Sequence, residues 1–422
     1  MARFGTPQRN ALRRTVPTFL LVVAIAAPAA AAVKKMFVTS VAGSTNLSTW
    51  PQAQGLSGLA AGDAICQTLA HDDAGLPSWQ DFRAWLSTLS EDAYCRVAGF
   101  DGLKVDDCGQ LGLPDAGPWQ RIDGRPFANS LSELTSDLAL LHPPAVDETG
   151  ELLQASSLLT GSNATGAAYA GGDCSGWTSG SAGNGRYGLT AAGGFWWTSS
   201  GLGSCGASGR LLCFESGSGD ALPAWEGPGL LAFVTSVTGP GDLGSWPEAG
   251  SAVGLAAGDA ICQSLATTAG LAAPQSFVAW LSTASVDAVD RLSADGPWKR
   301  LDGVEIAANR AALLTASPFL QTLPSALVVK EDGTYVGQNA YTGSTSLGRA
   351  TLEDCNGWTS ASAGTDATYG SVQDTRGYWT TSASQLVACS SPYRLYCFSN
   401  LGGIFRDGFE SGDRARWSAS VP

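Results

Sequence analysis

The chain repeats itself, and this duplication restricts its fold more than any other feature. The ten residues GLAAGDAICQ occur at 58–67 and again at 254–263. Each repeat unit spans roughly 170–180 residues, which suits one globular domain and is far longer than a solenoid repeat. Further matched segments are FVTSV at 37–41 and 233–237, FRAWLST at 82–88 and FVAWLST at 277–283, GPWQRIDG at 117–124 and GPWKRLDG at 296–303, and DCSGWTS at 173–179 and DCNGWTS at 354–360.

The duplication predicts two tandem domains, with segments of different composition around them. Residues 1–32 place arginines before the apolar run TFLLVVAIAAPAAAA, a pattern typical of a cleaved export signal. A Gly/Ser/Pro-rich linker separates the halves, and a Gly/Asp-rich tail follows the second. The predicted ranges are a signal peptide at 1–32, a first domain at 33–216, a linker at 217–230, a second domain at 231–400 and a C-terminal tail at 401–422.

Four cysteines of each half occupy matching positions, and the first half has two more. An even number per domain in an exported chain indicates disulfides. The extra cysteines, Cys95 and Cys108, lie in an insertion of about sixteen residues that the second half lacks, and we expect them to bond to each other. Spacing leaves three pairings open for each matched set of four. These sets are Cys66, Cys174, Cys205 and Cys213, and Cys262, Cys355, Cys389 and Cys397.

Local patterns predict an α+β fold. The spacing of Ile65, Cys66, Leu69 and Ala70 places them on one stripe of a helix that ends near Gly75. The same spacing predicts a second short helix that contains Phe82, Trp85 and Leu86. The rest of each half is rich in Gly, Ser, Thr and Trp and is typical of short strands and long loops.

These residues resemble the C-type-lectin fold, specifically its endostatin-like branch and related bacterial secreted domains of unknown function of the DUF1554 type. The resemblance covers nearly all of the chain after residue 32. It rests in the first half on Ala64, Cys66, Ala70, AGL at 74–76, FRAWLS at 82–87, TGSNATG at 160–166, Cys174, Trp177, Cys205 and LLCFE at 211–215. In the second half it rests on Cys262, AGL at 269–271, FVAWLS at 277–282, TGSTSLG at 342–348, Cys355, Trp358, Cys389 and LYCF at 395–398.

The resemblance implies two tandem C-type-lectin-like domains, each stapled by disulfides. It also implies the pairs Cys66–Cys213, Cys174–Cys205, Cys262–Cys397 and Cys355–Cys389. Calcium-dependent sugar binding does not carry over, because the chain has no Glu-Pro-Asn or Gln-Pro-Asp loop and reads Trp-Thr-Ser at 177–179 and 358–360. The heparin and zinc binding of endostatin does not carry over to an acidic, histidine-poor chain either.

Charge excludes some classes of partner. Without residues 1–32, which hold four arginines and no acidic residue, 20 basic residues stand against 37 acidic ones and the net charge is −17. This charge disfavours nucleic acids and other polyanions. After residue 32 no apolar run approaches twenty residues, so we expect no membrane span. The protein is expected to be exported to the extracellular space, the cell surface or the periplasm.

Few residues could support catalysis. The only histidines, His71 and His142, lie in the first half without counterparts in the second, and we expect them to be solvated or locally hydrogen-bonded. With all ten cysteines assigned to disulfides, no thiol nucleophile remains. We therefore expect no enzymatic activity. A carboxylate-based glycosidase is the enzyme class considered, and it is disfavoured because no acid/base pair of carboxylates stands out.

The candidate ligand-binding residues lie in the long loops at 160–200 and 342–384. They are Asn163, Asp173, Trp177, Asp354 and Trp358. The alternative for the recurring tryptophans is that they fill the core beneath the loops, which is the commoner use of tryptophan. No cofactor is expected. Calcium would need oxygen ligands such as Asp173 with Asp147 or Glu148, or Asp354 with Glu331 or Asp332, but no spacing matches a dedicated calcium loop.

The sequence thus predicts a bacterial, secreted or surface-exposed binding protein whose two modules recognise a glycan or an extracellular protein. Neutral hydrogen-bonding groups and a few aromatic residues would make the contacts. The alternative is a structural, envelope-associated protein without a soluble ligand.

Overall fold

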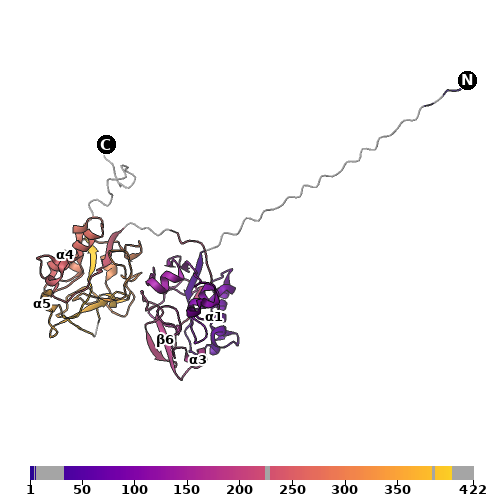
Figure 1. The fold of residues 1–422 in the computed structure, drawn as a ribbon, viewed down its shortest axis with the longest axis horizontal. Coiled ribbons are helices and arrows are strands. Elements are labelled where there is room, and N and C mark those ends of the chain that lie inside the picture. Colours follow the sequence, from indigo (N-terminus) through magenta and orange to yellow (C-terminus); the bar gives the residue numbers. More distant parts are fainter. Residues whose placement is uncertain (4, 6–32, 224–228, 383–384, 402–422) are drawn as a thin grey trace. The chain divides into compact units, whose positions relative to one another are not determined.

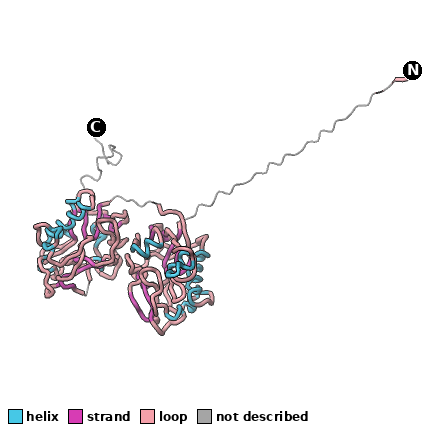
Figure 2. Tube along the Cα trace, viewed as in Figure 1, coloured by secondary structure: helices cyan, strands magenta, loops and turns pink. Residues whose placement is uncertain are grey.

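The structure is a computed structural model that describes residues 1–3, 5, 33–223, 229–382 and 385–401. The predicted signal peptide lies almost wholly outside these residues, as do part of the linker and nearly all of the C-terminal tail. Figure 1 follows the chain through its first module, in indigo to magenta, and its second, in orange to yellow. Loops and turns make up most of each module, as Figure 2 shows. None of the described helices is long and apolar enough to cross a membrane.

The first module is built on a five-stranded sheet with the strand order β2-β8-β1-β3-β4. Its first strand pairs with its last, since β1 runs antiparallel to β8 and parallel to β3. The strands are β1 Lys34–Val38, β2 Phe82–Ala84, β3 Trp119–Arg121, β4 Pro126–Ala128, β5 Ser157–Leu159, β6 Asn184–Leu189, β7 Gly201–Ser204 and β8 Leu212–Glu215. The helical segments are α1 Gly58–Asp72, α2 Ala93–Ala98, α3 Cys174–Trp177 and the short turns η1 Leu47–Thr49, η2 Pro51–Ala53, η3 Trp79–Asp81, η4 Lys104–Gly109 and η5 Glu133–Asp137.

The second module repeats this sheet with the order β10-β17-β9-β11-β12. Again the first strand, β9, lies between the last strand, β17, and a parallel neighbour, β11. The strands are β9 Leu230–Val234, β10 Phe277–Ala279, β11 Trp298–Lys299, β12 Glu305–Ala307, β13 Asn339–Tyr341, β14 Asp366–Ala367, β15 Tyr369–Ser371, β16 Val387–Ala388 and β17 Tyr396–Ser399. The helical segments are α4 Gly254–Thr268, α5 Cys355–Trp358, η6 Leu243–Ser245, η7 Pro247–Ala249, η8 Pro274–Ser276, η9 Val289–Arg291, η10 Arg310–Leu313 and η11 Gly377–Trp379.

Each sheet separates two apolar cores, because successive side chains of a strand point to opposite faces. In β8, Cys213 joins the cluster under α1, whereas Leu212 and Phe214 join a cluster of tryptophans on the other face. In β17, Cys397 and Phe398 divide between two corresponding clusters. With both faces covered, all four residues of β8 are buried. The prediction of a mixed α+β fold is therefore confirmed.

The repeated decapeptide forms the start of α1 and of α4. Ile65, Cys66, Leu69 and Ala70 lie on the buried face of α1, which ends at Asp72, so the predicted helix is confirmed. The predicted second helix is wrong: Phe82 begins strand β2, which pairs with β8. Its apolar residues do not share one face, since Phe82 and Leu86 pack beneath α1 while Trp85 packs among the tryptophans. A strand buried on both faces can imitate helical spacing.

All ten cysteines form disulfides, and each bond stays within one module. The pairing agrees with the expected one in every case. The bond between Cys66 and Cys213 joins α1 to the last strand of its module, and its counterpart joins α4 to β17. The five bonds are Cys66–Cys213, Cys95–Cys108, Cys174–Cys205, Cys262–Cys397 and Cys355–Cys389.

Candidate functional site

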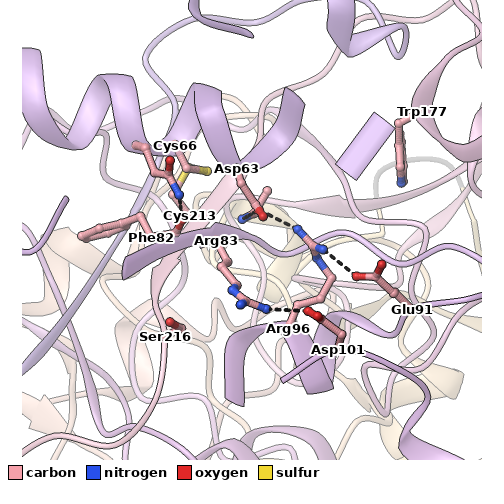
Figure 3. A network of polar contacts seen from close by, with 12 residues as sticks. Asp63, Cys66, Phe82, Arg83, Glu91, Arg96, Asp101, Trp177, Cys213 and Ser216 are labelled. Carbon is pink, nitrogen blue, oxygen red and sulfur yellow. Dashed lines mark hydrogen bonds and ion pairs between the residues drawn. A yellow bond between two sulfur atoms is a disulfide. The ribbon is translucent and has the colours of Figure 1, made fainter. Parts of the chain in front are cut away.

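The repeated decapeptide contributes an aspartate that ties the helix to the sheet. Oδ1 of Asp63 accepts a hydrogen bond from the backbone N–H of Ala84 at 2.9 Å and one from Nη2 of Arg96 at 2.6 Å. Figure 3 shows Asp63 pointing from α1 toward Arg96, whose guanidinium also faces Glu91. Burial raises the pKa of the Asp63 carboxyl, and the Arg96 charge opposes this rise. The Arg96 side chain is only 4% exposed, so the carboxylates neutralise a buried cation.

The second module repeats this arrangement. Nη2 of Arg291 donates to both carboxylate oxygens of Asp259, at 2.6 and 2.7 Å, and the N–H of Ala279 donates to Oδ1 at 2.9 Å. The cysteine of the decapeptide was predicted to form a disulfide, but no role was predicted for its aspartate. The exact repetition of an aspartate near the cysteine, Asp63 in the first half and Asp259 in the second, could have indicated a structural role for it. In both clusters a carboxylate of the first helix is paired with a nearly buried arginine, and this contact ties the helix to the rest of its module.

The predicted tryptophans lie in the core beneath the loops. Trp177 and Trp358 are fully buried, and their indole N–H groups donate to the carbonyl oxygens of Ser87 at 3.0 Å and Ser282 at 2.8 Å. As placed, neither ring has an exposed face on which a ligand could stack. The alternative considered from the sequence, that these side chains fill the core, agrees with this position.

The recurring Thr-Gly-Ser segment fits against these tryptophans. Gly161 has φ +63°, and a Cβ atom there would lie 2.8 Å from the Trp177 ring and 2.6 Å from the Ser87 carbonyl oxygen. Gly343 has φ +59° and an equally close approach to Trp358. Only glycine adopts this conformation and leaves this space without strain. The motif therefore packs the long loop onto the core.

The Cys-x-Gly-Trp segments form left-handed turns. From Cys174 to Trp177, in α3, the four φ angles are 48°, 59°, 66° and 64°. In α5, from Cys355 to Trp358, they are 53°, 55°, 68° and 64°. Such a turn costs about 1–2 kcal/mol for each residue other than glycine, so it persists only where its surroundings hold it. Here a disulfide holds one end of the turn and a buried tryptophan the other.

The remaining candidate residues occupy different positions around these turns. Asn163 stabilises its own loop, since Oδ1 accepts from Thr165 N at 2.9 Å and from Thr165 Oγ1 at 2.8 Å. Asp354 is buried and accepts from Gly357 N at 2.9 Å and from Ala284 N at 3.1 Å. Asp173 is half-buried, and its carboxylate makes no hydrogen bond within the described part of the chain. Asp173 and Trp177 thus share one turn, whereas Asn163 belongs to a separate loop.

The carboxylates considered for calcium serve other contacts. Glu148 accepts from Ser40 N at 2.8 Å, and Glu331 accepts from Ser236 N at 2.8 Å. Asp147 accepts from Thr149 N at 3.0 Å, and Asp332 accepts from Thr334 N at 2.9 Å. Within the described ranges, no three His, Cys, Asp or Glu side chains gather closely enough to hold a metal ion. In this structure these carboxylates stabilise turns and strand ends.

In the segments around each left-handed turn, exposed hydroxyl and amide side chains outnumber charged ones, and exposed leucines accompany them, Leu202 in the first module and Leu352 and Leu386 in the second. We call the exposed polar residues the loop rim of each module. The loop rim of the first module comprises Ser175, Thr178, Ser181, Asn184, Ser200, Ser204 and Ser208, and that of the second comprises Asn356, Thr359, Ser362, Asp366 and Ser390.

Internal contacts fix the backbone of the loop rim. In the first module Tyr187 OH donates to the carbonyl oxygen of Ser204 at 2.8 Å, and Thr45 Oγ1 donates to that of Ser179 at 2.6 Å. In the second module Ser360 Oγ and Thr365 Oγ1 lie 2.8 Å apart in a hydrogen bond. Short hydroxyl and amide side chains on a fixed backbone are suited to neutral hydrogen bonding with a ligand.

The second module also has a cleft of about 680 Å³. It lies at the end of α4 and is lined on its apolar side by Leu231, Leu265, Leu271 and Leu301. Its acidic side includes Glu331, whose Oε2 already accepts a hydrogen bond from the backbone of Ser236. The cleft therefore offers mainly apolar surface.

The two histidines make local contacts. His71 is exposed and lies 2.6 Å from the carboxylate of the adjacent Asp72. His142 is buried, and its Nδ1 donates to the carbonyl oxygen of Pro126 at 2.8 Å. Burial lowers the pKa of His142 from 6.5 to about 3, and the nearby Arg121 guanidinium adds to this shift.

This shift predicts acid sensitivity. Below about pH 6.5 the unfolded chain protonates His142 while the folded chain keeps it neutral, so stability falls as the pH falls from 6.5 toward 3. At pH 5 the cost is about 2 kcal/mol. Denaturant titrations at pH 7 and pH 5 should show that His142→Gln removes this part of the pH dependence, whereas His71→Gln retains it. Equal pH dependence in the wild-type protein and His142→Gln would contradict the assignment.

Comparison with protein-family models and with curated proteins found no match.

Proposed function

We propose that the chain is an exported binding protein with two C-type-lectin-like modules, which bind a glycan or an extracellular protein through their loop rims. The observation that carries the proposal is the repeated, rigid presentation of a neutral polar surface. In both modules a left-handed turn, a disulfide and a buried tryptophan hold the loop beneath the rim. Both modules keep a left-handed turn that is costly to form. A binding role for the surface that this turn supports explains why both keep it.

The chemistry of the rim supports binding over catalysis. Its hydroxyl and amide groups can exchange hydrogen bonds with a ligand but do not titrate near neutral pH. The predicted ligand candidates contribute in different ways. Asp173 precedes the turn, and its carboxylate makes no hydrogen bond within the described residues. Trp177 is buried and supports the turn through its hydrogen bond to Ser87. Five disulfides agree with folding in an oxidising compartment, where such ligands occur.

Two linked modules can bind a repeating ligand more tightly than either does alone, typically by a factor of about 10²–10⁴. The test is a glycan array and an extracellular-protein array probed with the chain after residue 32. We expect hits that weaken about a hundredfold or more in Asn184→Lys and that vanish when Thr359→Lys is added, because each lysine intrudes on one rim.

His71→Lys, on the exposed side of α1, is the control for added charge and should leave the hits unchanged. Hits that survive both rim substitutions, or arrays that stay silent while the protein assembles with itself, would contradict this function. The second result would favour a structural role in the envelope.

A further inference from the structure

Phe319 is the one exposed aromatic residue in the described part of the chain. Its side chain is 65% exposed, whereas the core tryptophans Trp280, Trp298 and Trp379 of the same module are fully buried. Leu320 beside it is 47% exposed. Phe319 and Leu320 thus form a small exposed apolar patch, and such patches are candidate contact sites when neighbouring groups add to them.

Two further side chains extend this exposed ring into a platform. The rings of Phe319 and Tyr378 meet edge to face, with centroids 5.5 Å apart and an interplanar angle of 88°. The guanidinium of Arg376 lies 4.8 Å from the centroid of the Tyr378 ring. We call Phe319, Arg376 and Tyr378 the aromatic platform.

Asp374 fixes the arginine of the aromatic platform. Nε and Nη2 of Arg376 donate to the two carboxylate oxygens of Asp374, at 2.9 and 2.6 Å. This two-pronged contact orients the guanidinium plane and neutralises its charge. Nη1 makes no hydrogen bond within the described residues, so its donors remain available to a ligand.

The backbone beneath the platform is rigid. The N–H of Gly377 donates to the carbonyl oxygen of Leu320 at 3.1 Å, and that of Thr315 donates to Ser346 at 3.0 Å. A Cβ atom at Gly377 would lie only 2.7 Å from Cγ2 of Thr315 and 2.8 Å from Cα of Pro318. The segments that carry Phe319 and Tyr378 therefore touch directly, and little ordering is left for a ligand to impose.

The first module lacks the platform. The segment from Ala307 to Gly333 is four residues longer than its counterpart from Ala128 to Gly150, and Phe319 lies in the longer version. When Trp197 is aligned with Trp379, the positions of Asp374, Arg376 and Tyr378 hold Ala192, Gly194 and Trp196. The charged pair and the exposed phenylalanine are thus special to the second module, although the sheet is common to both.

We propose that the aromatic platform is a saccharide-binding subsite for a neutral sugar ring. The C–H face of a pyranose stacks on the exposed ring of Phe319, because its partly positive hydrogens meet the negative face of that ring, while the perpendicular ring of Tyr378 packs against Phe319 and holds it in place. A sugar hydroxyl accepts a hydrogen bond from Nη1 of Arg376. The inference rests on the proposed binding function and names the ligand class for one module.

Size and charge favour a sugar over the other partners. A protein partner buries about 800 Å² on each side, far more than the few exposed side chains here can supply. A polyanionic glycan would meet a guanidinium already neutralised by Asp374, on a chain whose net charge after residue 32 is −17. A neutral oligosaccharide has the apolar face and the polar edge that the platform matches.

The test uses the chain after residue 32 with a panel of neutral oligosaccharides, and isothermal titration of the strongest one. We expect Phe319→Ala to weaken binding about tenfold or more, Phe319→Tyr to retain it, and Arg376→Ala to weaken it to a similar degree. Leu111→Ala, which trims an exposed apolar side chain in the insertion of the first module, is the matched control and should bind normally. Because Phe319 is exposed, the unfolding temperature of Phe319→Ala should equal that of the wild-type protein.

The outcomes separate this inference from the proposed function. Sugar binding that is lost in the loop-rim variants but unchanged in Phe319→Ala overturns the platform and leaves the proposed function standing. Hits on the extracellular-protein array, with none on the glycan array, likewise overturn the platform and leave the proposed function standing. Silence on both arrays overturns both.

Discussion

Replacing Cys66 and Cys213 together by alanine is expected to lower the free energy of unfolding of the first module by about 4–5 kcal/mol. The bond spans 147 residues of sequence, and closing so long a loop removes much of the conformational entropy of the unfolded chain. Domains are commonly stable by only about 5–15 kcal/mol, so the module should be close to unfolding at 37 °C. Hydrogen exchange in β1 and β8 measures the loss module by module.

The bond between Cys95 and Cys108 supplies the matched control. It spans 13 residues, and the same entropy argument gives about 3 kcal/mol for its removal. The second module should keep its full protection in both double variants, because no disulfide links the modules within the described chain. Equal losses from the two double variants, or no loss from removing Cys66 and Cys213, would refute the role assigned to the long-range bond.

The second large effect is expected from Asp63→Ala, which should destabilise the first module by about 3 kcal/mol. The substitution leaves the buried Arg96 with one carboxylate partner in place of two, and it removes the acceptor for the N–H of Ala84. Asp63→Asn keeps an acceptor for Ala84, so the difference between the two variants isolates that hydrogen bond. Denaturant titration followed by hydrogen exchange in α1 and β2 measures both.

Glu91 is the comparison within the same cluster. Its side chain is 31% exposed, and Glu91→Ala should cost only about 1 kcal/mol, as is usual for partly solvated ion pairs. Asp259→Ala should reproduce the larger effect in the second module, because Arg291 depends on Asp259 in the same way. If Asp63→Ala costs no more than Glu91→Ala, the cluster is not an anchor of the helix.

Much of the fold could be predicted from the sequence because repetition and cysteine count are unambiguous signals. The matched cysteines defined two equivalent halves, and the stripe around Cys66 defined α1. The stretch around Phe82 could not be assigned correctly from its spacing, since both faces of the sheet are covered and polar residues no longer mark a surface. The C-type-lectin-like assignment of each module stays a prediction.

Less of the candidate site could be predicted. Trp177 recurs in both halves, but recurrence does not distinguish a ring that binds a ligand from one that fills the core. The left-handed turns depend on distant groups, such as the disulfide to Cys205, that no local rule contains. The contact of Asp63 with Arg96 is likewise non-local, and Phe319 lies where the two halves differ in length, so the repeat gave no guide to it.

The central claim is that the first helix of each half is bonded to the last strand of that same half. Peptide mapping of the exported protein by mass spectrometry, without reduction, tests it most directly. The account predicts five disulfide-linked peptides, among them one that joins Cys66 to Cys213 and one that joins Cys262 to Cys397. Free thiols at these four positions, or a peptide that bonds a cysteine of one half to a cysteine of the other, would contradict it.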